Sequence, residues 1–170
     1  MTESTLRNVT LDDVSALERL FETNPDYTTR VMGREPSSGD ARSALTSLPP
    51  SVDPSHKIGF GLWDGSVLVA YADVIRGWPS PDTAHIGILM THGHRSGQGL
   101  GRQLHQAIIA EAQQWPGISR LRISIVDTNA EFADGFWSSL GYTKTGETMP
   151  YSADRVESFA HIWARAVDDR

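Results

Sequence analysis

Residues 94–103 read His-Arg-Ser-Gly-Gln-Gly-Leu-Gly-Arg-Gln, with three glycines at alternate positions. Before this stretch, the apolar run Ala84–Met90 predicts a β-strand. From Leu100, near the end of the stretch, apolar residues recur at helical spacing (Leu100, Leu104 and Ile108) and predict an α-helix. Glycines let backbone N–H groups approach a ligand closely, and a helix N-terminus carries a partial positive charge. The strand, turn and helix together therefore predict an anion-binding site.

The composition of the 170-residue chain indicates one globular domain over residues 1–170, with 39% hydrophobic and 21% charged residues. The formal net charge of −6 weighs against a nucleic-acid partner. The absence of cysteine excludes disulfides and thiolate catalysis. The N-terminal residues show no secretory leader, and no apolar run is long enough to cross a membrane. We therefore expect a cytoplasmic protein with no membrane partner.

Periodicity predicts alternating helices and strands on both sides of the glycine-rich stretch. The expected upstream segments are a strand at 6–10, a helix over 14–21, a polar loop at 27–38, a short helix at 40–48, and a hairpin of strands 57–63 and 66–75. The expected downstream segments are a helix reaching about 115, a strand at 121–126, a helix opened by a capping box at 128–131, and strands at 142–147 and 158–164. This order predicts an α/β (α+β) layered domain with a mixed sheet.

Two common nucleotide-binding turns do not fit the glycine-rich stretch. A Walker A loop has Lys and then Ser or Thr after its last glycine, whereas Arg102 and Gln103 follow Gly101. A dinucleotide-binding turn needs a third glycine at a position that Arg102 or Leu104 occupies. The anion is therefore expected to belong to another kind of ligand.

The stretch resembles the acyl-CoA turn of the GNAT N-acetyltransferase superfamily. That turn has Gln or Arg, two residues of any type, Gly, one more residue, and Gly or Ala, and Gly99 and Gly101 match its glycines. A second match comes from Asn129 followed by residues 136–142, Phe-Trp-Ser-Ser-Leu-Gly-Tyr, which resemble the family's Asn and aromatic-rich helix. The resemblance covers nearly the whole chain. It implies a mostly antiparallel mixed sheet of about seven strands, with about four helices on its two faces.

The resemblance also implies acetyl-CoA as cosubstrate and a set of cofactor-binding residues. Contacts to the pyrophosphate would come from Ser96, Gly97, Gln98, Gly99, Leu100, Gly101 and Arg102. The backbone of Leu89, Met90 and Thr91 would pair with the pantetheine arm, and Asn129 and Phe136 would lie against its other side. In one departure from the pattern, Ser96 holds the family's Gln or Arg position, and Arg95 lies one residue early.

The implied activity is transfer of an acetyl group to a primary amine of a small molecule or a protein, by direct attack in a ternary complex. A protonated amine must first lose a proton, which calls for a base. His85 on the central strand is one candidate, placed on the same strand face as Gly87 and Leu89. Asp73, a charged residue in an apolar run, is the second. A hydrogen-bonding role at a strand edge is an equally good interpretation of His85.

Trp137 occupies the position where the family commonly has a tyrosine acid. This departure keeps a second hypothesis open, a non-catalytic acyl-CoA-binding module on the same fold. The segments 27–38 and 151–157 and the hairpin tip are expected to line the acceptor pocket, the first of them as a lid or as plain connecting structure. His92 and His94 are interpreted as loop residues rather than metal ligands. Sheet edges near the C-terminus leave a homodimer open.

Overall fold

Seven strands form one mixed sheet in the computed structural model, which describes residues 3–168. The sheet order is β1-β2-β3-β4-β5-β7-β6, and only the β4–β5 pair is parallel. Residues 1, 2, 169 and 170 lie outside this range. Two of them belong to the N-terminal segment in which no secretory leader was expected. The strands are β1 (Thr5–Asn8), β2 (Lys57–Asp64), β3 (Val67–Arg76), β4 (Thr83–Thr91), β5 (Arg120–Val126), β6 (Thr143–Ala153) and β7 (Val156–Ala166). The mixed, mostly antiparallel sheet predicted above is confirmed.

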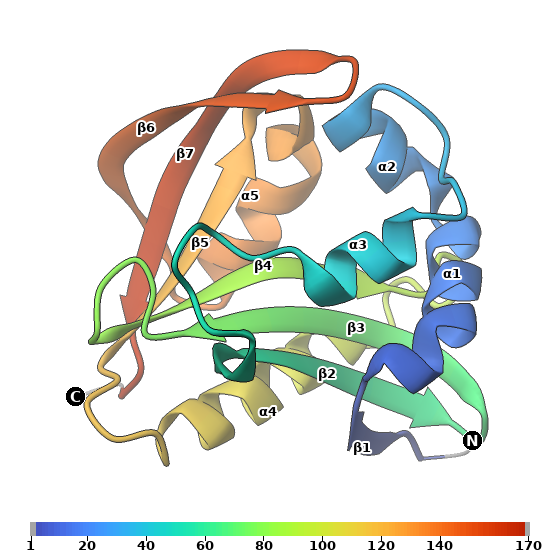
Figure 1. Ribbon diagram of the computed structural model, residues 1–170, viewed down its shortest axis with the longest axis horizontal. Coiled ribbons are helices and arrows are strands. Elements are labelled where there is room, and N and C mark those ends of the chain that lie inside the picture. Colours follow the sequence, from blue (N-terminus) through green and yellow to red (C-terminus); the bar gives the residue numbers. More distant parts are fainter. Residues whose placement is uncertain (1–2, 169–170) are drawn as a thin grey trace.

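The helices connect the strands on both faces of the sheet. Figure 1 shows the first three grouped together beside the sheet, with the β6–β7 hairpin extending across the top of the view toward them. Within residues 3–168 the α-helices are α1 (Val14–Thr23), α2 (Pro25–Met32), α3 (Asp40–Thr46), α4 (Leu100–Ala112) and α5 (Ala130–Ser139). Three short 3₁₀ helices are η1 (Leu11–Asp13), η2 (Pro54–His56) and η3 (Asp127–Asn129). None of the helices in this range is both long enough and apolar enough to cross a membrane.

Helix α2 lies where the sequence predicted a loop over residues 27–38. Pro25 does end α1, but it also stands at the first position of α2, where its fixed φ and missing N–H favour a helix start. Thr28 and Val31 form its short buried face, and Gly33 ends it with φ +73°. The helix count is therefore five rather than about four.

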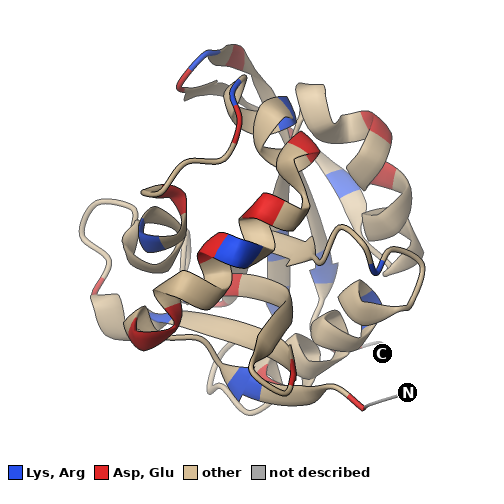
Figure 2. Cartoon of the chain, turned by 90° about the vertical axis from the view of Figure 1, so that its right-hand side faces the viewer, with Lys and Arg blue, Asp and Glu red and all other residues tan. Residues whose placement is uncertain are grey.

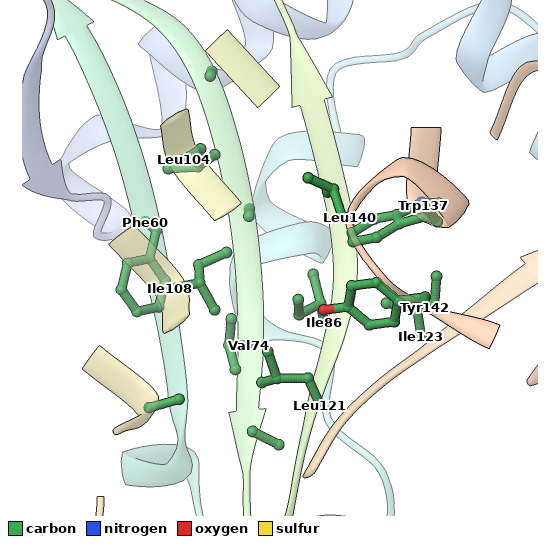
Figure 3. Close-up of a cluster of buried hydrophobic side chains, with 14 of the residues drawn as sticks. Phe60, Val74, Ile86, Leu104, Ile108, Leu121, Ile123, Trp137, Leu140 and Tyr142 are labelled. Atoms are coloured by element: carbon green, nitrogen blue, oxygen red, sulfur yellow. The ribbon is translucent and has the colours of Figure 1, made fainter. Parts of the chain in front are cut away.

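Two apolar cores hold the helices, one on each face of the sheet. Helices α4 and α5 pack over one face, where Leu104, Ile108 and Trp137 meet side chains of the central strands (Figure 3). Helices α1 and α3 pack over the other face around Leu17 and Tyr71. The sheet is thus fixed from both sides. In its middle, β4 and β5 pair over only a few residues and then separate.

Two local predictions near the C-terminal half need correction. The capping box expected at 128–131 does not form, because no side chain caps α5 at Asn129; a capping box joins Thr10 and Asp13 instead. Strands β6 and β7 are also longer than predicted, so that most of the segment 151–157 is strand around a short turn at its centre.

A bulge interrupts the pairing of β3 with β4. Asp73 lies opposite Ile88 and Val74 lies opposite Ile86, which leaves Gly87 as the extra residue. A bulge reverses the alternation of side chains beyond it. His85 therefore shares its face with Ile88, whereas Leu89 packs into the core on the other face. The prediction that His85 and Leu89 share a face is wrong for this reason.

Candidate active site

A cleft opens where β4 and β5 separate. The two strands pair only between Thr83–His85 and Arg120–Arg122. Beyond these residues they diverge, so that Gly87 and Ser124 are exposed although they lie in central strands. The cleft has a volume of about 590 Å³, and the two strands, the glycine-rich loop and the starts of α4 and α5 line it.

The lining of this cleft brings together nearly all the residues predicted to bind the cofactor. Those present are Leu89, Met90, Thr91, Ser96, Gly97, Gly99, Leu100, Gly101, Arg102, Asn129 and Phe136. Gln98 belongs to the loop but does not line the cleft. Segments separated by about a third of the chain therefore meet at one cavity.

The glycine-rich turn has the backbone geometry of an anion-binding site. Gly97 and Gly99 have φ values of +79° and +77°, a conformation that side chains disfavour. Gly99 is the N-cap of α4, and no side chain of the described chain caps this helix. The first N–H groups of α4 therefore point out of the helix without intrahelical partners. These groups fit the pyrophosphate of an acyl-CoA, the ligand that the resemblance implies.

The loop that leads into this turn is fixed by two contacts. The Arg95 Nη2 atom lies 2.8 Å from Asp64 Oδ2, at the end of β2. The Gly93 N–H donates to Thr23 Oγ1 at 3.0 Å, and a Cβ on Gly93 would lie only 1.8 Å from the Thr23 carbonyl oxygen. The β2–β3 hairpin tip, predicted to line the acceptor pocket, thus holds the glycine-rich loop and lines neither cavity.

Helix α2 is held against the opposite wall of the cleft by Arg30. Its Nε atom donates to Asn129 Oδ1 at 2.7 Å, and its guanidinium lies 4.0 Å from the centre of the Phe132 ring. On the same wall, a Cβ on Gly101 would lie 3.0 Å from Phe136 Cζ, so α4 and α5 approach closely there. The amide of Asn129 is therefore used to position α2.

A second cavity, of about 400 Å³, lies on the side of α1, α2 and α3. Four residues line both cavities: Tyr27, Gly87, Ser124 and Asn129. Parts of the segments 27–38 and 151–157, which were expected to line the acceptor pocket, line this second cavity. The Tyr151 hydroxyl donates to the Val31 carbonyl at 2.7 Å and joins the C-terminal hairpin to α2. The two cavities thus meet at the exposed part of the sheet.

The outer surface of the helices over this second cavity is mixed in charge. Figure 2 shows acidic and basic residues interspersed on that side of the molecule. Along α1 the charged residues are Glu18, Arg19 and Glu22, and α2 carries Asp26 and Arg30. A nucleic-acid-binding face has clustered Lys and Arg, so this arrangement does not favour one here.

Asp73 lines the second cavity beside Gly87, one of the residues shared by the two cavities. Its Oδ1 atom accepts from the Ile88 N–H at 2.8 Å, beside the bulge, and its Oδ2 atom lies 3.4 Å from Lys57 Nζ. A Cβ on Gly87 would lie 2.9 Å from Asp73 Oδ2, so only glycine leaves room for this carboxyl. Burial raises the pKa of Asp73 above its usual value, against the opposing charge of Lys57. The carboxyl is thus a proton acceptor of increased affinity.

The Nδ1 atom of His85, one of its two ring nitrogens, contacts a buried arginine. Its Nδ1 atom lies 3.0 Å from Arg122 Nη1. A guanidinium only donates, so Nδ1 must accept and the ring proton is on Nε2. Burial, with the charge of Arg122, lowers the pKa of His85 to about 3. The lone pair that a base needs is already occupied, so this geometry argues against the predicted base role and leaves Asp73.

Trp137 belongs to a buried aromatic cluster at the end of the first cavity. Its ring makes edge contacts with His105, Phe136 and Tyr142, at centroid distances of 6.0, 5.2 and 5.0 Å. His105 Nε2 and the Tyr142 hydroxyl are 2.8 Å apart. The indole therefore packs the core while one edge lines the cleft.

The two histidines before the glycine turn lie together in the loop. Their ring centres are 5.6 Å apart, and His92 Nδ1 accepts from the His94 N–H at 3.2 Å. Across residues 3–168, no group of three or more His, Cys, Asp or Glu is arranged to hold a metal ion. The structure thus groups no third ligand with them.

The sequence did not single out four polar residues at the second cavity: Tyr27, Thr28, Lys57 and Arg122. Tyr27, Thr28 and Lys57 line the cavity, and Arg122 lies behind His85. Arg122 stands between the apolar Leu121 and Ile123, as Asp73 stands between Ala72 and Val74. A charge at such a position is the signal that could have identified it.

Comparisons with known proteins agree with this geometry. The sequence pattern of the family described as "Acetyltransferase (GNAT) family" matches residues 18–142. An acetyltransferase from Thermus thermophilus has a similar structure, with a TM-score of 0.72, 25% identity and 97% of each chain covered. The ribosomal-protein-S18-alanine N-acetyltransferase from Escherichia coli is similar in fold, with a TM-score of 0.69, 19% identity, and 99% of this chain and 96% of that chain covered.

An N-acetyltransferase from Staphylococcus aureus also shares the fold, with a TM-score of 0.71, 20% identity, and coverage of 98% of this chain and all of that chain. A search of curated protein sequences gave no match. The family match covers most of the chain, including the glycine-rich turn and the aromatic-rich helix α5. The chain belongs to the GNAT acetyltransferase family.

Proposed function

We propose that this protein is an acetyl-CoA-dependent N-acetyltransferase that acetylates a primary amine of a small molecule in a ternary complex. The observation that carries the proposal is the meeting of two cavities at Gly87. One cavity ends at an anion-binding turn, and the other is closed by α2, α3 and the C-terminal hairpin. Direct attack needs both reactants bound at once with the reacting atoms in contact.

When bound, acetyl-CoA supplies the thioester that is attacked. The N–H groups around Gly97 and Gly99 and at the start of α4 would hold its pyrophosphate. Within residues 3–168, the edge of β4 that faces β5 has no ladder partner beyond His85, so the backbone of Leu89–Thr91 is available to the pantetheine arm. Phe136 would line the other side of the arm.

Asp73 is the residue to which we assign the proton of the acceptor ammonium. Its carboxyl lies against Gly87, where the two cavities join, and burial raises its proton affinity. The neutral amine nitrogen then forms a bond to the acetyl carbon as the carbon–sulfur bond breaks, and the electron pair leaves on sulfur. After attack, the nitrogen still carries one proton more than the neutral amide does. It loses this proton, and the thiolate takes up one proton to give CoA thiol.

The alternative, a non-catalytic acyl-CoA-binding module, is favoured by one observation. Trp137 offers an indole where the family commonly has a phenol, and this ring is packed among three aromatic side chains. Tight CoA binding without turnover on a broad amine panel would favour this alternative.

The proposal is tested by binding and turnover together. Calorimetry is expected to show acetyl-CoA binding in preference to ATP and NAD, because the turn lacks the features of both nucleotide motifs. A screen of primary amines, read by release of CoA thiol and by mass spectrometry of the product, is expected to give amine-dependent acetylation. No binding of acetyl-CoA at millimolar concentration would refute the proposal.

A further inference from the structure

Arg122 is a buried cation without a carboxylate partner. It is 5% exposed. Its Nη1 atom donates to His85 Nδ1, its Nη2 atom lies 3.6 Å from Met149 Sδ, and its guanidinium lies 5.2 Å from the Trp78 ring. No ion pair of the described chain includes it, and Glu147 acts on it only from beyond ion-pair distance. Its charge is therefore not neutralised within the fold.

This charge is relayed to the second cavity through His85. Because Nδ1 accepts from Arg122, the Nε2 atom carries the proton and can only donate. His85 lines the second cavity, and among residues 3–168 its Nε2 atom has no hydrogen-bond partner. The wall of the cavity thus presents an N–H donor with a cation directly behind it.

The other charges around the cavity cancel in pairs. Asp73 pairs with Lys57 at 3.4 Å, and Asp40 pairs with Arg34 at 2.8 Å. Arg34 also pairs with Asp154, which is 40% exposed at the hairpin tip. Among these charged groups of the described chain, Arg122 is therefore the one with no opposite charge at ion-pair distance.

A second polar group in this cavity is unsatisfied. The Thr28 Oγ1 atom is buried, lines the cavity and has no hydrogen-bond partner. A buried hydroxyl without a partner is unfavourable, and a ligand atom in the cavity can satisfy it. It lies on α2, whereas His85 lies on β4, and both residues line the same cavity.

We propose that the acceptor amine carries a carboxylate, which binds the His85 Nε2–H with the charge of Arg122 behind it. The inference rests on the proposed N-acetyltransferase function and narrows it to amino-acid-like acceptors. Arg122 acts as a positioning residue, since it fixes the ring proton on Nε2. His85 touches the substrate as a donor and not as a base.

Matched acceptors test this directly. α- and ω-amino acids are compared with their carboxamides and with aminoalkyl phosphonates, by kcat/KM for CoA thiol release. A hydrogen bond to a charged group is worth about 1.5–3 kcal/mol, so each carboxylate is expected to exceed its carboxamide by about ten- to a hundredfold. Equal values within the pairs, or a preference for phosphonates, would overturn the proposal.

Variants of the relay separate its two parts. Arg122→Met is expected to abolish the preference for carboxylates while the KM for acetyl-CoA stays unchanged. His85→Gln keeps an N–H donor and is expected to retain part of the preference, whereas His85→Leu loses it. A full preference in Arg122→Met would contradict the role of the buried charge.

A binding measurement keeps the inference testable if Arg122→Met fails to fold or if no amine is acetylated. Carboxylic acids without an amine are titrated calorimetrically into the wild-type protein saturated with CoA, beside their carboxamides. Binding of the acids alone would support the carboxylate site even if the proposed function failed. Acetylation of amines that have no carboxylate, together with no binding of carboxylic acids, would refute the carboxylate site. The proposed N-acetyltransferase function would then still stand.

Discussion

Replacement of Asp73 by asparagine separates its chemical role from its structural one. The amide keeps an oxygen to accept from the Ile88 N–H, so the bulge around Gly87 is retained. Lys57 loses its carboxylate but keeps its hydrogen bond to the Ser47 carbonyl. The free energy of unfolding should therefore change by no more than about 1–3 kcal/mol, the range for a buried group left partly unpaired.

The expected loss in turnover is much larger than this structural effect would produce. A positioned base contributes about 10²- to 10⁴-fold, so Asp73→Asn should lower kcat by that factor and leave the KM for acetyl-CoA unchanged. The assay is CoA thiol release as a function of pH. In the wild type, kcat/KM should fall as the pH drops through the pKa of Asp73, because protonation removes the base. Burial raises that pKa, so this limb lies above the value of about 3.9 for a free aspartate.

Asp82→Asn is the matched control, because that carboxylate is exposed and lies outside both cavities. It should leave the kinetics unchanged. If the Asp73→Asn protein keeps the wild-type kcat and the same fall of kcat/KM at low pH, the assignment of Asp73 as the base is refuted. Water would then be the acceptor of the ammonium proton.

Gly87→Ala should destabilise the protein by about 1–3 kcal/mol and lower kcat, because its Cβ would lie 2.9 Å from Asp73 Oδ2; thermal unfolding and thiol release measure both effects. Arg30→Met should raise the KM for acetyl-CoA several-fold, because it removes the 2.7 Å bond to Asn129 that holds α2 at the cleft; steady-state kinetics measure this. The free energy of unfolding should decrease as the pH is lowered from 6.5 to about 4. In this range the unfolded chain takes up a proton on His105, whereas burial lowers the pKa of this histidine to about 4 and keeps it neutral in the folded protein. The slope reaches about 1.4 kcal/mol per pH unit for one proton, and His105→Gln should reduce it in denaturant titrations.

Each of these predictions has a clear contrary result. Gly39→Ala is the control for Gly87→Ala, since a Cβ there meets nothing within 4 Å, and equal effects at both sites would contradict the clash. Arg19→Met, a change on α1 outside both cavities, is the control for Arg30→Met. Identical pH slopes for the wild type and His105→Gln would show that this histidine is not the group responsible.

The lining of the first cavity could be predicted because the residues that determine it are close in sequence. The alternation of glycines from Gly97 to Gly101 reports a backbone conformation, and apolar spacing reports the strand before it and the helix after it. These signals depend on neighbouring residues, so the cleft lining agrees with the prediction at all but Gln98. The sheet also followed from short-range alternation.

The second cavity could be predicted only in part, because its contacts are long in range. Helix α2 is only eight residues long, and its docking depends on Asn129, which lies 99 residues after Arg30. The role of His85 depended on Arg122, which reaches its ring only through the parallel pairing of β4 with β5. The bulge at Gly87 also shifts side chains between faces, which regular alternation cannot anticipate.

Acetyl transfer is tested most directly by following both products in one reaction. The purified protein is incubated with acetyl-CoA and the panel of amino acids and amines, and CoA thiol and N-acetylated product are measured together. We predict that the two products form in equal amounts and only when an amine acceptor is present. Thiol release without an acceptor, or bound CoA with no acetylated product from any amine, would contradict an N-acetyltransferase that joins its two substrates at Gly87.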